Sequence, residues 1–398
     1  MSFFYSGKLD IAGHNEESAA VWKAFREGNP VRVPVSVAGS IRVYLQNPEL
    51  NTRGWTFRDF FENLDVQIAA QVEYEKWRRF NVLCDHEMGM PRDGWSVFAD
   101  FQNSLDSAWM GCPVVYPGGA LPDTLPTLAK NKQALYDMPE QVEDGGLFSR
   151  AVEFYDAMLE ASQEREYYGL PVLPPAFAPG ENTDGPLDLA YKLRGADNLL
   201  VDMLTDETYY HDLMGYVTEN LIRRMKRMRE YRWKRRPDSR DKGEYRRDGF
   251  FFADDAIALI SRDHYREFVY PYHKRIFDEF STGKAAAMHL CGDATRHFKY
   301  ISDKLNVSLF DTGFPVDHGA LRRELGPGVT IQGGPTVMLV QCGTPQAIAG
   351  EVERICGSGV MDGGKFVMIA ANNMAPMTPV ENIEALYEAT KAYGRYQQ

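Results

Sequence analysis

The stretch KAAAMHLCG at residues 284–292 decides the fold, because an apolar run that ends in a polar turn recurs along the chain. Near-continuous apolar runs are typical of strands that are buried on both faces of a parallel sheet. The runs are residues 31–39, 81–89, 169–180, 249–255, 284–292, 307–313, 329–334 and 366–373. Helical patterns lie between them, and strands that alternate with helices form right-handed βα units. The pattern predicts an α/β protein, a (β/α)8 TIM barrel built from eight such units.

The helical patterns carry their own start and break signals. Residues 262–280 repeat apolar side chains on one helical face, and Pro271 is expected to kink this helix because proline removes a backbone donor. Thr344 followed by Pro345 predicts a helix start, with threonine as the cap and proline in the first turn.

The chain has 398 residues, which is within the range of TIM barrels that carry insertions. We therefore predict one domain over residues 1–398. Residues 90–168 separate the second and third expected strands and begin with an aromatic stretch rich in Gly and Pro. This segment predicts an insertion on the barrel, between strands 2 and 3.

Composition and charge exclude several classes of protein. A net charge of −12 argues against a nucleic-acid binder, which needs a basic surface. The first residues lack a basic and apolar signal, and no apolar run is long enough to span a membrane. Five cysteines show no disulfide-like spacing, so we expect reduced thiols and a cytoplasmic location. A homodimer is left open.

Polar side chains follow the expected strands, where the active site of a barrel lies. His289 and Cys291 are two residues apart on one strand, so their side chains point to the same face. Imidazole plus thiolate suits zinc, whereas the alternative is a buried cysteine beside a hydrogen-bonded histidine. Further candidates at the strand ends are Asp85, His86, Asp254, Asp255, Asp311, Gln332, Asn372 and Asn373.

At these residues the chain resembles the uroporphyrinogen decarboxylase superfamily, and within it the zinc-dependent, corrinoid-linked methyltransferases. The resemblance runs through ordered blocks at 185–204, 253–280, 289–298, 310–317, 331–335, 342–348 and 375–396. It implies a (β/α)8 barrel. The resemblance to uroporphyrinogen decarboxylase itself is poorer, since Arg42 is the one arginine left from the segment that holds the substrate's carboxylates. Porphyrinogen decarboxylation is therefore not expected.

The resemblance implies a zinc site with His289 and Cys291 as ligands. Asn372 stands where those methyltransferases have a second cysteine, and an amide oxygen is a poor zinc ligand beside a thiolate. We expect Asp311 to complete the site, with Asp254 or Asp255 as the next choice and Cys342 below them. The remaining assignments are Asp255, His86 and Asn372 as catalytic groups and Asn373, Gln332 and Asp254 as substrate-binding groups.

The resemblance also implies an activity. It predicts a zinc-dependent methyltransferase that moves a methyl group between a small substrate and the cobalt of a corrinoid on a small partner protein. Loss of one thiolate favours activation of a methyl ether or methylamine over methylation of a coenzyme thiol, although a carboxylate ligand weakens that inference. The alternatives are a metal-independent lyase acting on a carboxylated substrate and a non-catalytic binding protein with the same barrel.

Overall fold

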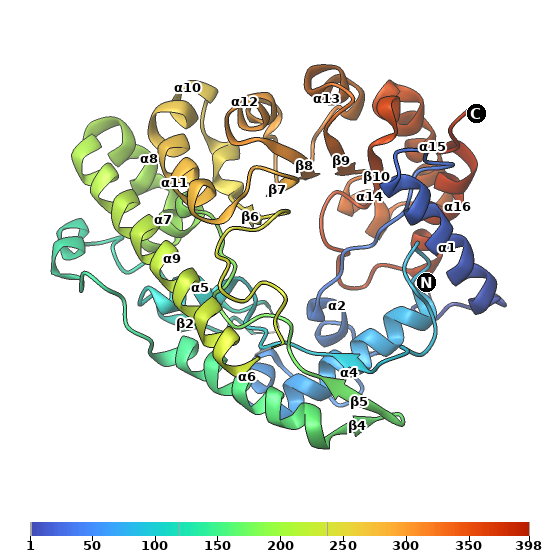
Figure 1. Cartoon of the computed structure of the whole chain (residues 1–398), viewed down its shortest axis with the longest axis horizontal. Helices are drawn as coiled ribbons and strands as arrows, with labels where there is room; N and C mark the ends of the chain where they lie inside the picture. The colour runs from blue at the N-terminus through green and yellow to red at the C-terminus, as the bar shows by residue number, and fades with distance from the viewer. Residues whose placement is uncertain (1, 119, 237, 398) are drawn as a thin grey trace.

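The protein is built around a parallel sheet, seen in the computed structural model of Figure 1, which describes residues 2–118, 120–236 and 238–397. Its strand order is β10-β9-β8-β7-β6. The strands are β6 (Phe251–Ala253), β7 (Ala286–Leu290), β8 (Val307–Thr312), β9 (Thr330–Gly333) and β10 (Phe366–Met368). The last five of the expected strands are thereby confirmed, and so is the α/β class.

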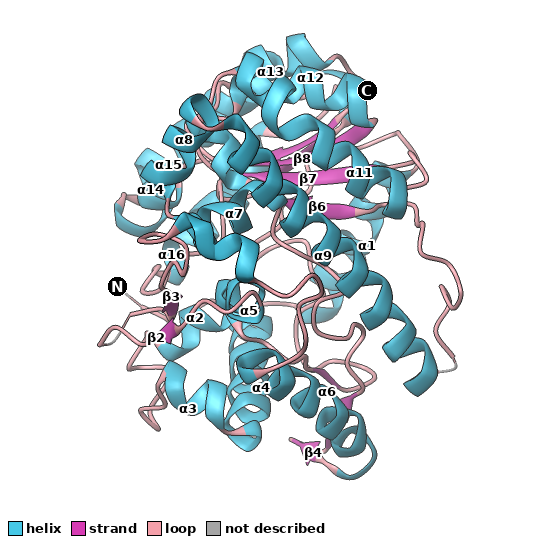
Figure 2. Ribbon diagram, turned by 90° about the vertical axis from the view of Figure 1, so that its left-hand side faces the viewer, coloured by secondary structure: helices cyan, strands magenta, loops and turns pink. Residues whose placement is uncertain are grey.

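Helices connect these strands in the expected alternation. The connections and the C-terminal helix are α10 (Arg262–His264), α11 (Tyr270–Phe280), α12 (Thr295–Leu305), α13 (His318–Leu325), α14 (Val337–Cys342), α15 (Pro345–Ile355) and α16 (Val380–Tyr393). Figure 2 shows β6, β7 and β8 side by side with α11 and α12 next to them. Met288 and Phe310 are fully buried in the core between sheet and helices. Because the five strands are parallel, their carboxyl ends lie at the same edge of the sheet.

The start and break signals of the helices are confirmed. Thr344 accepts a hydrogen bond from the backbone N–H of Ala347 and Pro345 is the first residue of α15. The pattern at residues 262–280 is interrupted by one widened turn at Tyr265–Val269, directly before α11 and its Pro271. Such widened turns are a recognised cause of helix bending.

Three expected strands differ from the prediction. The run 31–39 makes a single parallel bridge, Val35 to Met368, and the described residues 81–89 form no strand. The run 169–180 contains β5 (Leu170–Leu173), which pairs with β1 (Trp95–Ser96) and β4 (Glu166–Tyr167) and not with the main sheet. This run holds four prolines, which lack the N–H that a sheet ladder requires.

The segment 90–168 packs against the N-terminal helices. It contains β1, α5 (Leu105–Trp109), the antiparallel pair β2 (Val114–Val115) and β3 (Asp123–Thr124), and α6 (Gly146–Glu164). A second hydrophobic cluster joins Ile68 and Val72 of α4 (Leu64–Asn81) to Trp95, Met158 and Val172. The other helices are α1 (Ile11–Arg26), α2 (Ile41–Leu45), α3 (Phe57–Glu62), α4 (Leu64–Asn81), α7 (Pro186–Arg194), α8 (Ala196–Thr205) and α9 (Glu207–Arg235).

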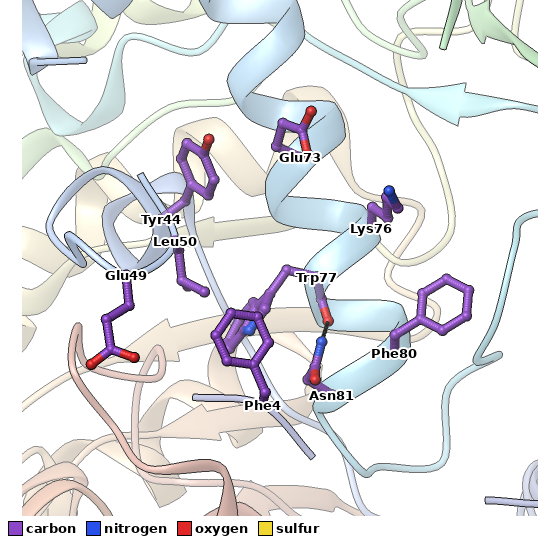
Figure 3. Close-up of a pocket in the computed structure, with 9 residues that line it drawn as sticks. All are labelled: Phe4, Tyr44, Glu49, Leu50, Glu73, Lys76, Trp77, Phe80 and Asn81. Carbon is purple, nitrogen blue, oxygen red and sulfur yellow. Dashed lines mark hydrogen bonds between the residues drawn. The ribbon is translucent and has the colours of Figure 1, made fainter. Parts of the chain in front are cut away.

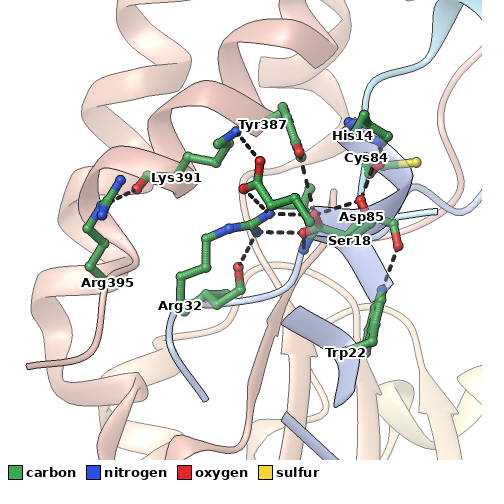
Figure 4. A network of polar contacts seen from close by, with 12 residues as sticks. His14, Ser18, Trp22, Arg32, Cys84, Asp85, Tyr387, Lys391 and Arg395 are labelled. Carbon is green, nitrogen blue, oxygen red and sulfur yellow. Dashed lines mark hydrogen bonds and ion pairs between the residues drawn. The ribbon is translucent and has the colours of Figure 1, made fainter. Parts of the chain in front are cut away.

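Asp85 joins the N-terminal part of the chain to its C-terminal helix (Figure 4). Its carboxylate accepts two hydrogen bonds from Arg32, at 2.6 and 2.7 Å, and one from the backbone N–H of Val35 at 2.7 Å. Ser18 of α1 and Tyr387 of α16 contact the same carboxylate at 3.4 and 3.5 Å. A side-chain network therefore connects the segments at 32–35 and 85, where a strand ladder was expected.

All five cysteines carry free thiols, as expected. Within the described ranges we find no helix with both the length and the apolar character needed to cross a membrane.

Candidate metal centre

The centre is built on β7, which carries His289 and ends just before Cys291. The two side chains meet as the strand alternation predicts, with His289 Nε2 2.9 Å from Cys291 Sγ. Asp255 approaches from the turn after β6, where its Oδ1 accepts the backbone N–H of Cys291 at 2.7 Å. One donor atom from each of Asp255, His289 and Cys291 lies within 4.8 Å of the others, so the three groups form a possible metal site.

Asp311 lies behind His289 and outside this group of three. The two residues are paired in register on β7 and β8, and Asp311 Oδ2 is 2.7 Å from His289 Nδ1. Burial lowers the pKa of His289, but the contacts with Asp311 and Cys291 outweigh burial and raise the pKa to about 11. Asp311 therefore holds the ring so that Nε2 faces Cys291 and Asp255.

Cys291 has a second neighbour, the amide of Asn372 in the turn after β10. Asn372 Nδ2 donates a hydrogen bond to Cys291 Sγ at 2.8 Å. Burial raises the pKa of the Cys291 thiol, while the hydrogen bond from His289 acts in the opposite direction. The residue that replaces the expected second cysteine thus contacts the sulfur of the first.

Gln332 belongs to the same row of residues as His289 and Asp311. In the register of the sheet, His289 is paired with Asp311 and Asp311 with Gln332. Residues paired across neighbouring strands project to the same face of a sheet, so Gln332 extends the row toward β10.

Asp254 sits deeper than its neighbour Asp255 and is fully buried. Its carboxylate accepts the backbone N–H groups of Leu187 and Asp188 at the start of α7, at 3.1 and 2.9 Å. Its Oδ2 is 2.7 Å from His273 Nε2. Burial raises the pKa of Asp254 to about 8 and lowers that of His273 to about 3, so the two groups form a neutral hydrogen bond near pH 7.

Asp188 of α7 in turn binds the backbone of the turn after β6. Its carboxylate accepts the backbone N–H groups of Asp255 and Ala256, at 2.8 and 2.7 Å. This reciprocal pairing fixes the turn after β6 against α7 and thereby positions Asp255 beside Cys291. Burial, followed by the charges of Asp254 and Asp255, raises the pKa of Asp188 well above its ordinary value.

His86 and Asn373 lie in the wall of a cavity of about 700 Å³ beside the centre. Asn373 links the cavity to the centre, because it directly follows Asn372, whose side-chain amide contacts Cys291 Sγ at 2.8 Å. Burial and then the charge of Arg78 lower the pKa of His86. The other lining residues include Val37, Gly39, Ser40, Ile41, Arg42, Gln71, Tyr74, Glu75, Arg78, Ser96, Phe98, Asp100, Gln102 and Asn103.

Arg42 is one of the cavity residues to which the sequence prediction gave no role. Its Nε donates to Gln102 Oε1 at 2.7 Å and its Nη2 to Asn103 Oδ1 at 3.0 Å, and both acceptors are neutral amides. Arg42 lies on the short helix α2, whereas the prediction considered strand ends. Its one sequence signal was the match to the arginine segment of the decarboxylases.

A smaller cavity of about 250 Å³ lies on another face of α4 and includes Phe4, Trp77 and Phe80 (Figure 3). Helix α4 presents Glu73, Lys76, Trp77 and Phe80 to it, whereas Gln71, Tyr74, Glu75 and Arg78 line the cavity beside the centre. None of the predicted site residues lines the smaller cavity.

The chain is similar to a family model, to a methyltransferase sequence and to a solved methyltransferase structure. Residues 248–393 match the model of the uroporphyrinogen decarboxylase (URO-D) family. The chain is 25% identical over 342 residues to the methylated-thiol–coenzyme M methyltransferase of Methanosarcina mazei, covering 85% of this chain and 79% of that protein. A solved structure of a methyltransferase from Methanosarcina mazei has a TM-score of 0.59 and 16% identity, covering 94% of this chain and 98% of the other.

These findings confirm the resemblance that was stated from the sequence. The structural likeness, at its low identity, shows the fold, and the fold of the URO-D family is a TIM barrel.

Proposed function

We propose that this chain, in which residues 248–393 form a URO-D family domain, is a zinc-dependent methyltransferase that works with a corrinoid protein. It moves a methyl group between a small substrate and the cobalt of the corrinoid. The observation that carries the proposal is the convergence of Asp255, His289 and Cys291 on one point. The methyltransferase relative from Methanosarcina mazei supports the reaction class.

The chemistry of the donor atoms fits zinc. Carboxylate oxygen, imidazole nitrogen and thiolate sulfur are its usual ligands, and catalytic sites combine three protein ligands with one open position. Metal-binding histidines usually hold a carboxylate with the other ring nitrogen, as His289 holds Asp311. In this proposal Asp255 becomes the third ligand, and Asp311 orients His289.

Bound zinc supplies Lewis acidity, which makes the oxygen or nitrogen of a methylated substrate a better leaving group. The chain's own residues bind and orient that substrate in the cavity of about 700 Å³. Asn373 lines this cavity, and Gln332 extends the row of His289 and Asp311. His86 is neutral near pH 7 because its pKa is lowered, so its ring is able to accept a proton there.

The substrate that we propose is a methyl ether or a methylamine. Asp255 contributes a negative charge where the second thiolate is missing, which weakens the preference for these substrates over a coenzyme thiol. The cavity favours a polar substrate, because charged side chains of both signs lie in its wall, Arg42 and Arg78 together with Glu75 and Asp100. Among the described residues, Arg42 donates to the neutral amides of Gln102 and Asn103. Asp254 contributes by fixing the turn that carries Asp255.

We further propose that the sheet closes into an eight-stranded barrel within one domain, residues 1–398. The bridge from Val35 to Met368 extends the β10 edge, and the N–H of Asp85 donates to the carbonyl of Val35. The bridge from Asp184 to Ala253 extends the β6 edge. Three segments thus occupy the positions of the missing strands, and 90–168 is the insertion. That the protein is cytoplasmic is still a prediction, and so is the formation of a homodimer.

Metal analysis of the purified protein tests the proposal. We expect about one zinc per chain in the wild type, and its loss in His289→Ala and Cys291→Ala. Cys342→Ala is the matched control, because it removes an exposed cysteine outside the centre. Zinc-free wild-type protein that transfers methyl groups would refute the role of zinc, and failure to transfer methyl to or from a corrinoid protein would refute the reaction.

A second candidate is supported by the same centre. Cys291, His289 and Asp311 are linked at 2.9 and 2.7 Å, an arrangement of nucleophile, base and carboxylate that works without a metal. This arrangement differs from the metal-independent lyase of the sequence analysis, but like it would act without a metal. Activity that survives complete removal of zinc and depends on Cys291 would favour this candidate over the first.

A further inference from the structure

We infer that Asn372 is a positioning residue that acts on the metal through Cys291: its amide N–H directs a hydrogen bond at the sulfur and leaves the fourth metal position open. This inference rests on the proposed zinc site and deepens it. It assigns a role to the residue that stands where related methyltransferases have a second thiolate.

The orientation of the amide is determined by its surroundings. The backbone N–H of Asn373 donates to Asn372 Oδ1 at 2.6 Å, which fixes this atom as the oxygen. The other end of the amide is then the nitrogen, and it lies 2.8 Å from Cys291 Sγ. The backbone N–H of Asn372 donates to the carbonyl of Ala370 at 2.6 Å, so the turn is also held at its main chain. The side-chain amide of Asn372 is therefore held in the orientation in which it donates to Cys291 Sγ.

The sulfur of Cys291 therefore receives the N–H of Asn372 and also lies within 4.8 Å of a donor atom of Asp255 and of His289. A hydrogen bond to a thiolate withdraws electron density from the sulfur, because the donor competes for the same lone pairs. Interactions of this kind behind a ligand tune a bound metal. A thiolate that donates less density leaves zinc more electrophilic toward a substrate atom.

The amide also does not add charge. Asp255 and Cys291 bring two negative charges as ligands, which balance Zn²⁺, whereas a thiolate at position 372 would add a third. Zinc prefers four ligands in a tetrahedron, and among the described residues three are grouped at the centre. An uncharged donor at position 372 thus keeps the fourth position available to a substrate.

Cobalt(II) in place of zinc provides a direct test, because a thiolate ligand gives it a charge-transfer band in the near ultraviolet. Metal-free protein is titrated with cobalt(II) chloride, and the band is recorded for the wild type, Asn372→Ala, Asn372→Cys and Asn373→Ala. Asn373→Ala is the matched control, since it keeps the backbone N–H that orients the Asn372 amide.

We expect Asn372→Ala to shift the band to longer wavelength, because a sulfur without its hydrogen bond gives up an electron more easily. Asn372→Cys should strengthen the band by adding a second thiolate, and Asn373→Ala should leave it at the wild-type position. Circular dichroism checks that each variant is folded. If Asn372→Ala does not fold, the strength of the band in Asn372→Cys still tests the role of position 372.

An unshifted band in Asn372→Ala, or an unchanged band in Asn372→Cys, would overturn the role of Asn372 while leaving the metal site intact. Absence of any thiolate band in the wild type would overturn the metal site itself, and the two failures are therefore distinguishable.

Discussion

Substitution of Asp85 by asparagine is predicted to destabilise the protein well beyond the effect of losing a surface ion pair. Asp85 Oδ1 and Oδ2 both accept hydrogen bonds from Arg32, and Oδ2 also accepts the N–H of Val35. Asparagine has one acceptor end and one donor end, so either orientation of its amide points a donor at a donor. The guanidinium of Arg32 is 6% exposed and keeps Glu17 as its carboxylate partner, at the edge of solvent.

The magnitude follows from burial. Removing one partner of a buried ion pair costs about 3–5 kcal/mol, and Glu17, whose side chain is 44% exposed, compensates the buried charge of Arg32 only in part. The entropy of unfolding is about 2.1 cal/mol/K per residue, which for 398 residues gives about 0.8 kcal/mol per kelvin. The loss then corresponds to a decrease of about 4–6 °C in Tm.

Differential scanning calorimetry of wild type and Asp85→Asn measures this decrease. Asp144→Asn is the matched control, because Asp144 also accepts two hydrogen bonds from one arginine, Arg227, at 2.7 and 2.6 Å, but in a partly exposed position. The control should lose at most about 1 kcal/mol, or about 1 °C. A double variant, Arg32→Met with Asp85→Asn, should recover part of the loss, since no unpaired charge stays buried. Equal shifts for Asp85→Asn and Asp144→Asn would refute the reasoning.

Three further predictions concern the centre. Asp311→Asn should weaken zinc binding about 10- to 100-fold in a chelator competition, because His289 loses the carboxylate that orients it, and unchanged affinity would contradict this. Zinc at about 100 times its Kd should stabilise the wild type by about 2.7 kcal/mol, and so raise Tm by about 3 °C, but should leave Cys291→Ala unaffected. Burial raises the pKa of Asp254 to about 8, so the stability it contributes is complete below the unfolded pKa of about 3.9 and is lost as pH rises through about 8. Asp254→Asn lacks this carboxyl group, so the Tm of the variant minus that of the wild type should increase between about pH 5 and about pH 9. A difference in Tm that does not change with pH would show that Asp254 does not titrate in this way.

The carboxyl-terminal half of the fold could be predicted from the sequence because its strands are continuous apolar runs. The runs at 284–292 and 307–313 hold fully buried side chains such as Met288 and Phe310, as expected for strands that are covered on both faces. Alternation along β7 also predicted that His289 and Cys291 share a face, and their side chains do meet, at 2.9 Å.

The first three strands could not be predicted in the same way, because contacts distant in sequence decide them. The run 81–89 contains Asp85, whose partners Arg32 and Tyr387 are 53 and 302 residues away. Apolar content alone suggests a strand there, whereas the buried carboxylate joins several segments at one point. In 169–180 the four prolines limit pairing with the main sheet, and the apolar content of the run does not reveal this.

The positions of Asp311 and Asp255 beside His289 and Cys291 follow from strand register and from the turn after β6. Asp311 and His289 are paired on adjacent strands, so the carboxylate meets the side of the ring and reaches Nδ1. Asp255 lies in a turn that the reciprocal bonds of Asp188 and Asp254 fix against α7. Register and turn position are properties of the folded chain, and residue spacing does not reveal them.

The replacement of a thiolate by Asn372 therefore need not make the proposed site more electrophilic through charge alone. With Asp255 as a ligand, the protein supplies two negative charges, as a site with one histidine and two thiolates would. The centre has a hydrogen bond from Asn372 to Cys291, which in the proposed site would weaken the donor strength of the one sulfur ligand. Any preference for activating a methyl ether or methylamine then depends on that hydrogen bond. Asn372→Ala should accordingly lower methyl transfer from such substrates more than it lowers zinc content.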